Sequence, residues 1–245
     1  MNVEEHTADL PTALGPMRVH VYHPAGEARV PAIAVYSEIY QETGPIKRSA
    51  LRLAGQGFLV AVPEVFHEHE PPGTVLAYDK VGTDKGNLYK YATKLATYDT
   101  DARTMLDFLR DHPRSTGHLG AIGWCLGGHL AFRAALHADV RATACFYATD
   151  LHSDTLGEGK ESDSLARMKD VRGELLMVFG RQDPHVPDEG RAKIHAALRA
   201  AGTKFSFHEL NAAHAFMRDE GPRYDPALAE IGWSLALELF RRALV

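Results

Sequence analysis

The chain has 245 residues, of which 45% are hydrophobic and 24% are charged. These proportions are ordinary for a globular protein and exclude a disordered or fibrous chain. A chain of this length buries about 70% of its unfolded surface, which one core can hold, so we expect a single domain over residues 1–245. Lysine and arginine number 27 against 32 acidic residues, and no basic run stands out. This balance argues against a nucleic acid or an anionic membrane as partner.

The cysteine count and the first residues bear on the compartment. Cys125 and Cys145 are too few for a disulfide framework, which favours a reducing environment. Residues 1–6 lack the basic start and apolar run of a signal peptide. No stretch approaches the roughly 18 consecutive apolar residues of a membrane span. We therefore expect a cytoplasmic protein.

Short apolar runs alternate with longer segments of helical periodicity, which predicts an α/β fold with a mostly parallel sheet and helices on both faces. In chain order the predicted elements are a strand at 30–36, a helix at 46–56, a strand at 58–62, a helical stretch at 85–110 with a break near 97–100, a strand at 119–123, a helix at 128–137, strands at 142–147 and 175–179, a helix at 189–200, a strand at 204–210 and a helix at 226–244. The polar, glycine-containing segment 150–163 is expected to be exposed.

The most informative segment is LGAIGWCLGGHLAF, residues 119–132. It contains G-x-S-x-G with Cys125 in place of serine, between a predicted strand and a predicted helix, which is the context of a nucleophile elbow. Side chains at Gly123 or Gly127 would collide with the adjoining elements of so sharp a turn. The helix dipole would stabilise a Cys125 thiolate, and the Leu126 N–H would face a developing oxyanion. The alternative is that Cys125, like Cys145 in its apolar strand, only fills space in the core.

A nucleophile needs a base, and the base needs an orienting acid. Asp183 follows the predicted strand 175–179, and His214 follows the strand that ends near Leu210. Both have suitable chemistry, in the order nucleophile, acid, histidine, and at the strand ends where open α/β sheets place their sites. This coincidence favours a functional set over unrelated loop residues.

Two other motifs are weaker. His67 and His69 could suggest a metal pair, but no third ligand accompanies them at metal-site spacing, so we expect no metal. His185 adjoins the predicted acid and is interpreted as a surface loop residue. The glycines of GWCLGG lack the G-x-G-x-x-G spacing of a dinucleotide site, and no cofactor is expected.

Over essentially its whole length, from about residue 30, the chain resembles the dienelactone hydrolase (carboxymethylenebutenolidase) family. The most specific marks are GWCLGG, GRQDPHVP, HAFMR and the segment SEIY at 37–40. The resemblance implies an α/β-hydrolase fold and a Cys-His-Asp triad without a metal. It assigns Cys125 as nucleophile, His214 as base and Asp183 as the orienting acid.

The resemblance also gives a role to Glu38, which in the family approaches the nucleophile until substrate displaces it. A carboxylate beside a thiol disfavours a second negative charge, so the thiol can rest protonated and protected from oxidation. By the same analogy, the backbone N–H groups of Ile39 and Leu126 form the oxyanion hole.

Substrate recognition follows from the same resemblance. The family holds a substrate carboxylate with arginines, and Arg218 in HAFMR matches one of them. Lys85 stands where the second arginine is expected, four residues before Tyr89, and lysine binds a carboxylate as a point charge only. Tyr40 belongs to the pocket segment after the first core strand.

Together these observations predict a hydrolase that cleaves a small ester or lactone, carrying a carboxylate, through an acyl-enzyme on Cys125. One alternative is a broader carboxylesterase or thioesterase in which Arg218 is structural. Another is a non-catalytic member that binds a ligand or responds to oxidation at Cys125. The expected partner is a small molecule, and the expected assembly is a monomer or small homo-oligomer.

Overall fold

The computed structural model describes residues 2–245, and one eight-stranded sheet runs through them. Its order is β1-β2-β4-β3-β5-β6-β7-β8; β2 pairs antiparallel with β1 and β4, and all the other pairs are parallel. The strands are β1 (Val3–Thr12), β2 (Gly15–Pro24), β3 (Val30–Tyr36), β4 (Leu59–Pro63), β5 (Ser115–Trp124), β6 (Val140–Phe146), β7 (Glu174–Gly180) and β8 (Phe205–Leu210). The predicted α/β architecture with a mostly parallel sheet is confirmed.

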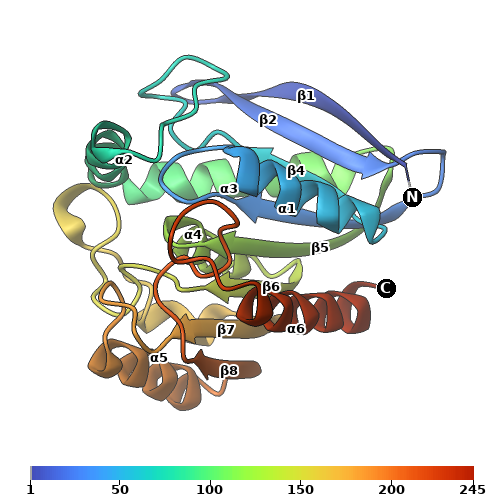
Figure 1. Cartoon of the computed structure of the whole chain (residues 1–245). Helices are drawn as coiled ribbons and strands as arrows, with labels where there is room; N and C mark the ends of the chain where they lie inside the picture. The colour runs from blue at the N-terminus through green and yellow to red at the C-terminus, as the bar shows by residue number, and fades with distance from the viewer. Residues whose placement is uncertain (1) are drawn as a thin grey trace.

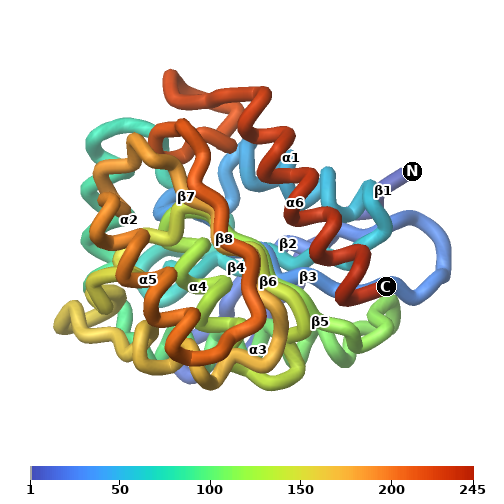
Figure 2. Tube along the Cα trace, turned by 90° about the horizontal axis from the view of Figure 1, so that it is seen from below, coloured from blue at the N-terminus to red at the C-terminus, as the bar shows by residue number. Residues whose placement is uncertain are grey.

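Helices cover both faces of the sheet (Figures 1 and 2). The α-helices are α1 (Gly44–Gly55), α2 (Lys80–Ala92), α3 (Leu95–Asp111), α4 (Leu126–Ala135), α5 (Asp188–Ala201) and α6 (Pro226–Leu244), with short 3-10 turns η1 (Glu158–Lys160) and η2 (Ala166–Asp170). Helices α1 and α6 lie on one face, whereas α3, α4 and α5 lie on the other. Within residues 2–245 no helix combines the length and the apolar character needed to cross a membrane.

The two-sided core follows from the alternation of side chains along each strand. In β3, Ala32 and Ala34 pack toward α3 and α4, whereas Ile33 and Val35 pack toward α1 and α6. Because side chains of a strand alternate between its faces, a strand covered on both faces is apolar throughout. This is why β3 and its parallel neighbours are recognisable as continuous apolar runs.

Two features differ from the expected pattern. The antiparallel hairpin β1–β2 was not predicted. The break in the helical stretch 85–110 falls at Thr93, not at 97–100, because Thr93 is buried in an extended conformation. Its carbonyl accepts a hydrogen bond from the Glu158 N–H (2.9 Å), and this bond to a distant loop holds the chain out of the helix.

The segment 150–163 is only partly exposed, contrary to expectation. Leu151 and Leu156 are fully buried in the core beside α4, and η1 forms the exposed tip. The segment therefore forms part of the wall above the carboxyl ends of the strands.

Candidate active site

A cavity of about 550 Å³ opens at the carboxyl ends of the parallel strands, and residues of α2 form part of its wall. Six residues predicted for the site line it, namely Glu38, Ile39, Tyr40, Cys125, His214 and Arg218. They come from the loop after β3, the β5–α4 turn and the loop after β8. This is the edge at which open α/β sheets bind their ligands.

Cys125 occupies the turn between β5 and α4 in a strained conformation, with φ +60° and ψ −121°. A side chain at Gly123 would collide with the Gly127 carbonyl, and one at Gly127 would collide with the Tyr36 carbonyl. The glycines thus allow α4 to approach β3 and β5 closely enough to form the turn. Strain of this kind costs roughly 1–3 kcal/mol and persists only where the surrounding structure enforces it.

Strained backbone also surrounds the turn. Tyr147, Asp150 and Ala215 adopt φ values of +38°, +62° and +59° in the loops that follow β6 and β8. None of them is glycine, for which such angles carry no penalty. Their gathering around one cavity favours a functional site over an ordinary crossover.

Asp183 and His214 form a buried pair behind the cavity wall. The Asp183 Oδ2 lies 2.7 Å from the His214 Nδ1, and the second oxygen of Asp183 accepts a hydrogen bond from the His185 N–H (2.8 Å). Asp183 is 2% exposed and His214 is 5% exposed. With Nδ1 donating to the carboxylate, the His214 Nε2 is free to exchange a proton with a neighbour.

Cys125 and His214 interact electrostatically. Burial lowers the pKa of His214, but the charge of a Cys125 thiolate and hydrogen bonds to Asp183 and Cys125 outweigh it and raise the pKa to about 10. The Cys125 Sγ also lies 4.0 Å from the Thr149 Oγ1. Asp183 and Cys125 therefore both favour the protonated form of His214.

Glu38 lines the same cavity but is paired with other groups. Its Oε2 lies 3.4 Å from Nη1 of Arg218 and 3.5 Å from the Tyr78 hydroxyl. Burial raises the pKa of Glu38, while Arg218 and His214 oppose that rise. Arg218 also stacks over the Tyr78 ring, with 4.2 Å between Cζ and the ring centroid.

The N–H groups predicted for the oxyanion hole are both available. Leu126 is the first residue of α4, and Ile39 lies in the turn after β3 at the cavity wall. Within residues 2–245 neither N–H has a hydrogen-bond acceptor. The first N–H groups of a helix have no partner within it, so the Leu126 N–H is a donor for a ligand.

Lys85 and Tyr89, which were predicted to hold substrate, lie outside this cavity. Both side chains turn to Glu70, whose Oε1 lies 2.6 Å from the Lys85 Nζ and 2.7 Å from the Tyr89 hydroxyl. The face of α2 that lines the cavity carries Thr83 and Asn87 instead. Residue 85 is two positions from residue 83, about 200° around the helix, so it points away from the cavity.

Three charged residues in the cavity were not predicted. Arg223, on the loop before α6, lines the cavity and its charge helps to oppose the rise in the pKa of Glu38. Lys90 of α2 is 8% exposed and pairs with Asp150 at 2.9 Å. No local sequence signal marks these residues, because the fold brings them to the cavity from distant segments.

The remaining candidates have structural contacts. His67 lies 2.8 Å from an Asp101 carboxylate oxygen, and His69 stacks on Tyr89 with ring centroids 4.8 Å apart. Within residues 2–245 no group of three or more His, Cys, Asp or Glu side chains is arranged to hold a metal ion. Cys145 is fully buried, and burial raises the pKa of its thiol above the ordinary range. The His185 ring is exposed at the cavity and lies against His214, with 4.6 Å between centroids.

Comparison with known proteins relates the whole chain to one family. A Saccharomyces cerevisiae protein named "Putative carboxymethylenebutenolidase" is 42% identical over 256 residues, which cover 100% of this chain and 93% of that protein. A carboxymethylenebutenolidase of a Pseudomonas species is 25% identical and covers 93% of this chain and 91% of its own. The crystal structure of a Klebsiella pneumoniae protein named "Putative Dienelactone Hydrolase" superimposes with a TM-score of 0.86 at 22% identity, covering 99% of this chain and 100% of the other. The dienelactone hydrolase family matches residues 17–244, and the chain therefore belongs to that family.

Proposed function

We propose that this chain hydrolyses a small ester or lactone with Cys125 as nucleophile, His214 as general base and Asp183 as the orienting acid. Membership of the dienelactone hydrolase family makes it a carboxylic ester hydrolase. The observation that carries the proposal is a cysteine at a strained strand-to-helix turn in the same cavity as a histidine hydrogen-bonded to a buried aspartate. These are the relations that a nucleophile, its base and the orienting group require.

In the acylation step the Cys125 Sγ attacks the carbonyl carbon and His214 accepts the thiol proton. The carbonyl oxygen becomes an oxyanion, which the Ile39 and Leu126 N–H groups stabilise. The bond to the leaving oxygen then breaks, and His214 returns its proton to that oxygen. The products of this half-reaction are an alcohol or enol and a thioester on Cys125.

In the deacylation step a water attacks the thioester and gives its proton to His214. The same two N–H groups stabilise the second oxyanion. The carbon–sulfur bond breaks, the sulfur recovers a proton from His214, and the carboxylic acid leaves. An enol leaving group suits a cysteine enzyme, because its weak basicity lets the thioester form without strong proton donation.

The charges on the cavity wall favour a substrate with a carboxylate near the ester. Arg218 and Arg223 both line the cavity, and both guanidinium charges act on Glu38. A guanidinium binds a carboxylate through two parallel hydrogen bonds. Tyr40 lines the same cavity, with its hydroxyl 2.8 Å from the Thr83 Oγ1.

A broader carboxylesterase or thioesterase is the second candidate. It is favoured by the contacts of Arg218, which is held between Glu38 and Tyr78 and so has a structural role without substrate. Lys85, the other predicted carboxylate ligand, is outside the cavity. Under this alternative the acyl group is uncharged and the chemistry at Cys125 is the same.

The chemistry is tested with Cys125→Ala, using Cys145→Ala in the core as the matched control. We expect Cys125→Ala to lower kcat at least about 10³-fold and Cys145→Ala to retain most of it. Mass spectrometry of the quenched wild-type enzyme should find the acyl group on the peptide that contains Cys125. Substantial turnover by Cys125→Ala would contradict the proposal.

The substrate class is tested with two activated esters that share a leaving group, one carrying a carboxylate and one neutral. If the carboxylate is recognised, Arg218→Ala and Arg223→Ala raise KM for the charged ester only. Equal kinetics on both esters in all three proteins would support the broader esterase. A wild-type protein inert to both would favour a non-catalytic member of the family.

A further inference from the structure

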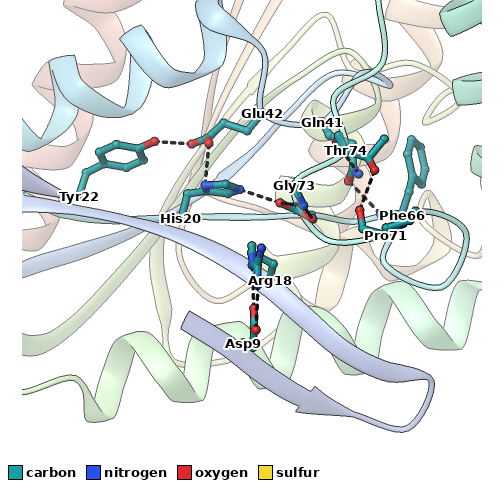
Figure 3. Close-up of polar contacts among 11 residues, drawn as sticks. Asp9, Arg18, His20, Tyr22, Gln41, Glu42, Phe66, Pro71, Gly73 and Thr74 are labelled. Carbon is teal, nitrogen blue, oxygen red and sulfur yellow. Dashed lines mark hydrogen bonds and ion pairs between the residues drawn. The ribbon is translucent and has the colours of Figure 1, made fainter. Parts of the chain in front are cut away.

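His20 of β2 lies outside the cavity, between two buried carboxylates (Figure 3). Its Nδ1 is 2.8 Å from the Glu42 Oε2, and its Nε2 is 2.8 Å from the Glu64 Oε1. The carboxylate side chains are 8% and 3% exposed, and that of His20 is 19% exposed. Both ring nitrogens are therefore engaged in short contacts with groups of the opposite charge.

This geometry defines the charge of His20. An ionised carboxylate only accepts hydrogen bonds, so an imidazole held between two carboxylates must donate from both nitrogens. Only the imidazolium does so. Burial lowers the pKa of His20, but hydrogen bonds to Glu42 and Glu64 outweigh it and raise the pKa to about 9.

The two carboxylates belong to different loops at the carboxyl ends of β3 and β4. Glu42 lies three residues after Ile39, in the loop that also carries Glu38. Glu64 directly follows β4, and its two oxygens accept hydrogen bonds from the Gly73 N–H at 3.0 and 2.9 Å. A single cation on β2 thus ties the loop of Glu38 and Ile39 to the 64–76 loop.

The loop of Glu38 and Ile39 also contacts the 64–76 loop directly. Gln41 is buried with φ +65°, and its amide donates to the Thr74 carbonyl (3.1 Å) and accepts from the Phe66 N–H (3.2 Å). The Leu76 N–H donates to the Tyr40 carbonyl at 3.1 Å. A non-glycine residue in this conformation is retained only where its surroundings impose it.

We propose that the His20 imidazolium is a positioning residue, which holds the loop of Glu38 and Ile39 so that the Ile39 N–H is aimed at the developing oxyanion. His20 touches neither substrate nor Cys125 in this scheme and acts through Glu42. The effect on turnover rests on the proposed function, whereas the effect on the loop does not.

Few other polar groups lie near His20, Glu42 and Glu64. The Tyr22 hydroxyl donates to the second oxygen of Glu42 at 2.6 Å. Arg18, two residues before His20 on β2, pairs with Asp9 at the surface and contributes a positive charge near Glu64. Lys47 lies 5.9 Å from the Tyr22 ring centroid and pairs with Glu5. Burial and Glu42 hold the pKa of Tyr22 well above its usual range, so its hydroxyl keeps its proton when His20 loses its own.

The test compares His20→Gln with Arg18→Gln, which removes an ion pair from the same strand but none of the loop contacts. Gln can donate to one carboxylate but cannot supply the positive charge. In His20→Gln, hydrogen–deuterium exchange should rise at least about fivefold in peptides covering 38–43 and 64–76, with Arg18→Gln like the wild type. Unchanged exchange in these two segments would overturn the proposal, whatever the activity.

Turnover supplies a second readout that a merely structural role would not move. His20→Gln should lower kcat about tenfold with little change in KM, because misdirected oxyanion donors weaken binding of the transition state only. The wild type should have the higher kcat at pH 7, and the two kcat values should become equal above about pH 9, where His20 itself loses its proton. A kcat ratio independent of pH would overturn the role of the charge.

A second variant covers the case in which His20→Gln does not fold. Glu42→Gln keeps the His20–Glu64 contact and removes the negative charge that pairs His20 with the loop of Ile39, while its amide oxygen can still accept from the Tyr22 hydroxyl. It should show faster exchange at 38–43 while 64–76 stays protected. If the wild type hydrolyses no ester, the proposed function fails, and the exchange measurements alone decide the positioning role.

Discussion

Gly86 of α2 lies directly against the carbonyl oxygen of Ile39, so closely that a side chain at position 86 would collide with that oxygen. The Cβ of Ile39 lies on the same side of the contact, 2.9 Å from where a Cβ on residue 86 would be. The helix therefore rests its backbone on the peptide that follows Ile39. The orientation of the Ile39 main chain depends on glycine at this position.

Gly86→Ala is expected to lower kcat about tenfold or more by displacing the Ile39 main chain. Alanine is favoured over glycine within a helix by roughly 0.5–1 kcal/mol, so any loss of activity cannot come from weaker helix propensity. Gly55→Ala in α1 is the control, because nothing lies within 4 Å of a Cβ there. Steady-state kinetics with an activated ester measure both variants, and unchanged kcat in Gly86→Ala would contradict the role of this contact.

Asp183→Asn is expected to lower kcat about 10³-fold or more while the fold is retained. The His185 N–H donates to one oxygen of Asp183, so it selects the amide orientation with oxygen on that side. The amide NH₂ then faces the His214 Nδ1, which has to accept, and the proton moves to Nε2. This is the wrong tautomer for a general base. Kinetics and urea unfolding together test this, since a stability loss without a large kcat loss would contradict it.

Arg223→Ala should raise KM for a carboxylate-bearing ester about three- to tenfold, consistent with loss of one exposed charge contact. Lys85→Ala should leave KM unchanged, because the Lys85 side chain pairs with Glu70 outside the cavity. Both residues are cationic and exposed, so the pair controls for a general change of surface charge. Equal effects of the two substitutions would contradict the assignment of the cavity wall.

His20 should also make stability depend on pH. Its pKa in the folded chain is about 9, above the ordinary 6.5, so the folded state holds the proton more tightly than the unfolded state. This stabilisation is complete below about pH 6.5 and is lost as the pH rises through 9. We expect a contribution of about 2 kcal/mol at neutral pH. Urea unfolding should show that the free energy of unfolding falls less between pH 7 and pH 9.5 in His20→Gln than in the wild type.

The parts of the site that could be predicted are those marked by the sequence immediately around them. The elbow is visible because Gly123 and Gly127 are required sterically on both sides of Cys125, and all three fall within five residues. Asp183 and His214 are visible because each lies in the loop that follows a predicted strand, and parallel strands end at one edge. In both cases neighbouring residues carry the information.

The parts that were missed depend on distant segments. Strand β1 is mostly exposed, so it lacks the apolar alternation that marks a strand. The position of Lys85 and Tyr89 outside the cavity was not foreseen, because the resemblance gives their spacing along α2 but not the rotation of the helix about its axis. Arg223 and Lys90 reach the cavity only through tertiary packing. The contact of His20 with two loops also arises only from tertiary packing.

The antiparallel hairpin has a consequence for solubility. Strand β1 forms one edge of the sheet and carries Glu4, Glu5, His6 and Asp9, charged or titratable side chains that discourage another chain from pairing with it. Strand β2, behind it, is buried along most of its length. A protein shortened by residues 1–14 would present β2 as the new edge, and we expect such a chain to aggregate through strand addition even where the cavity at the carboxyl ends of the strands is intact.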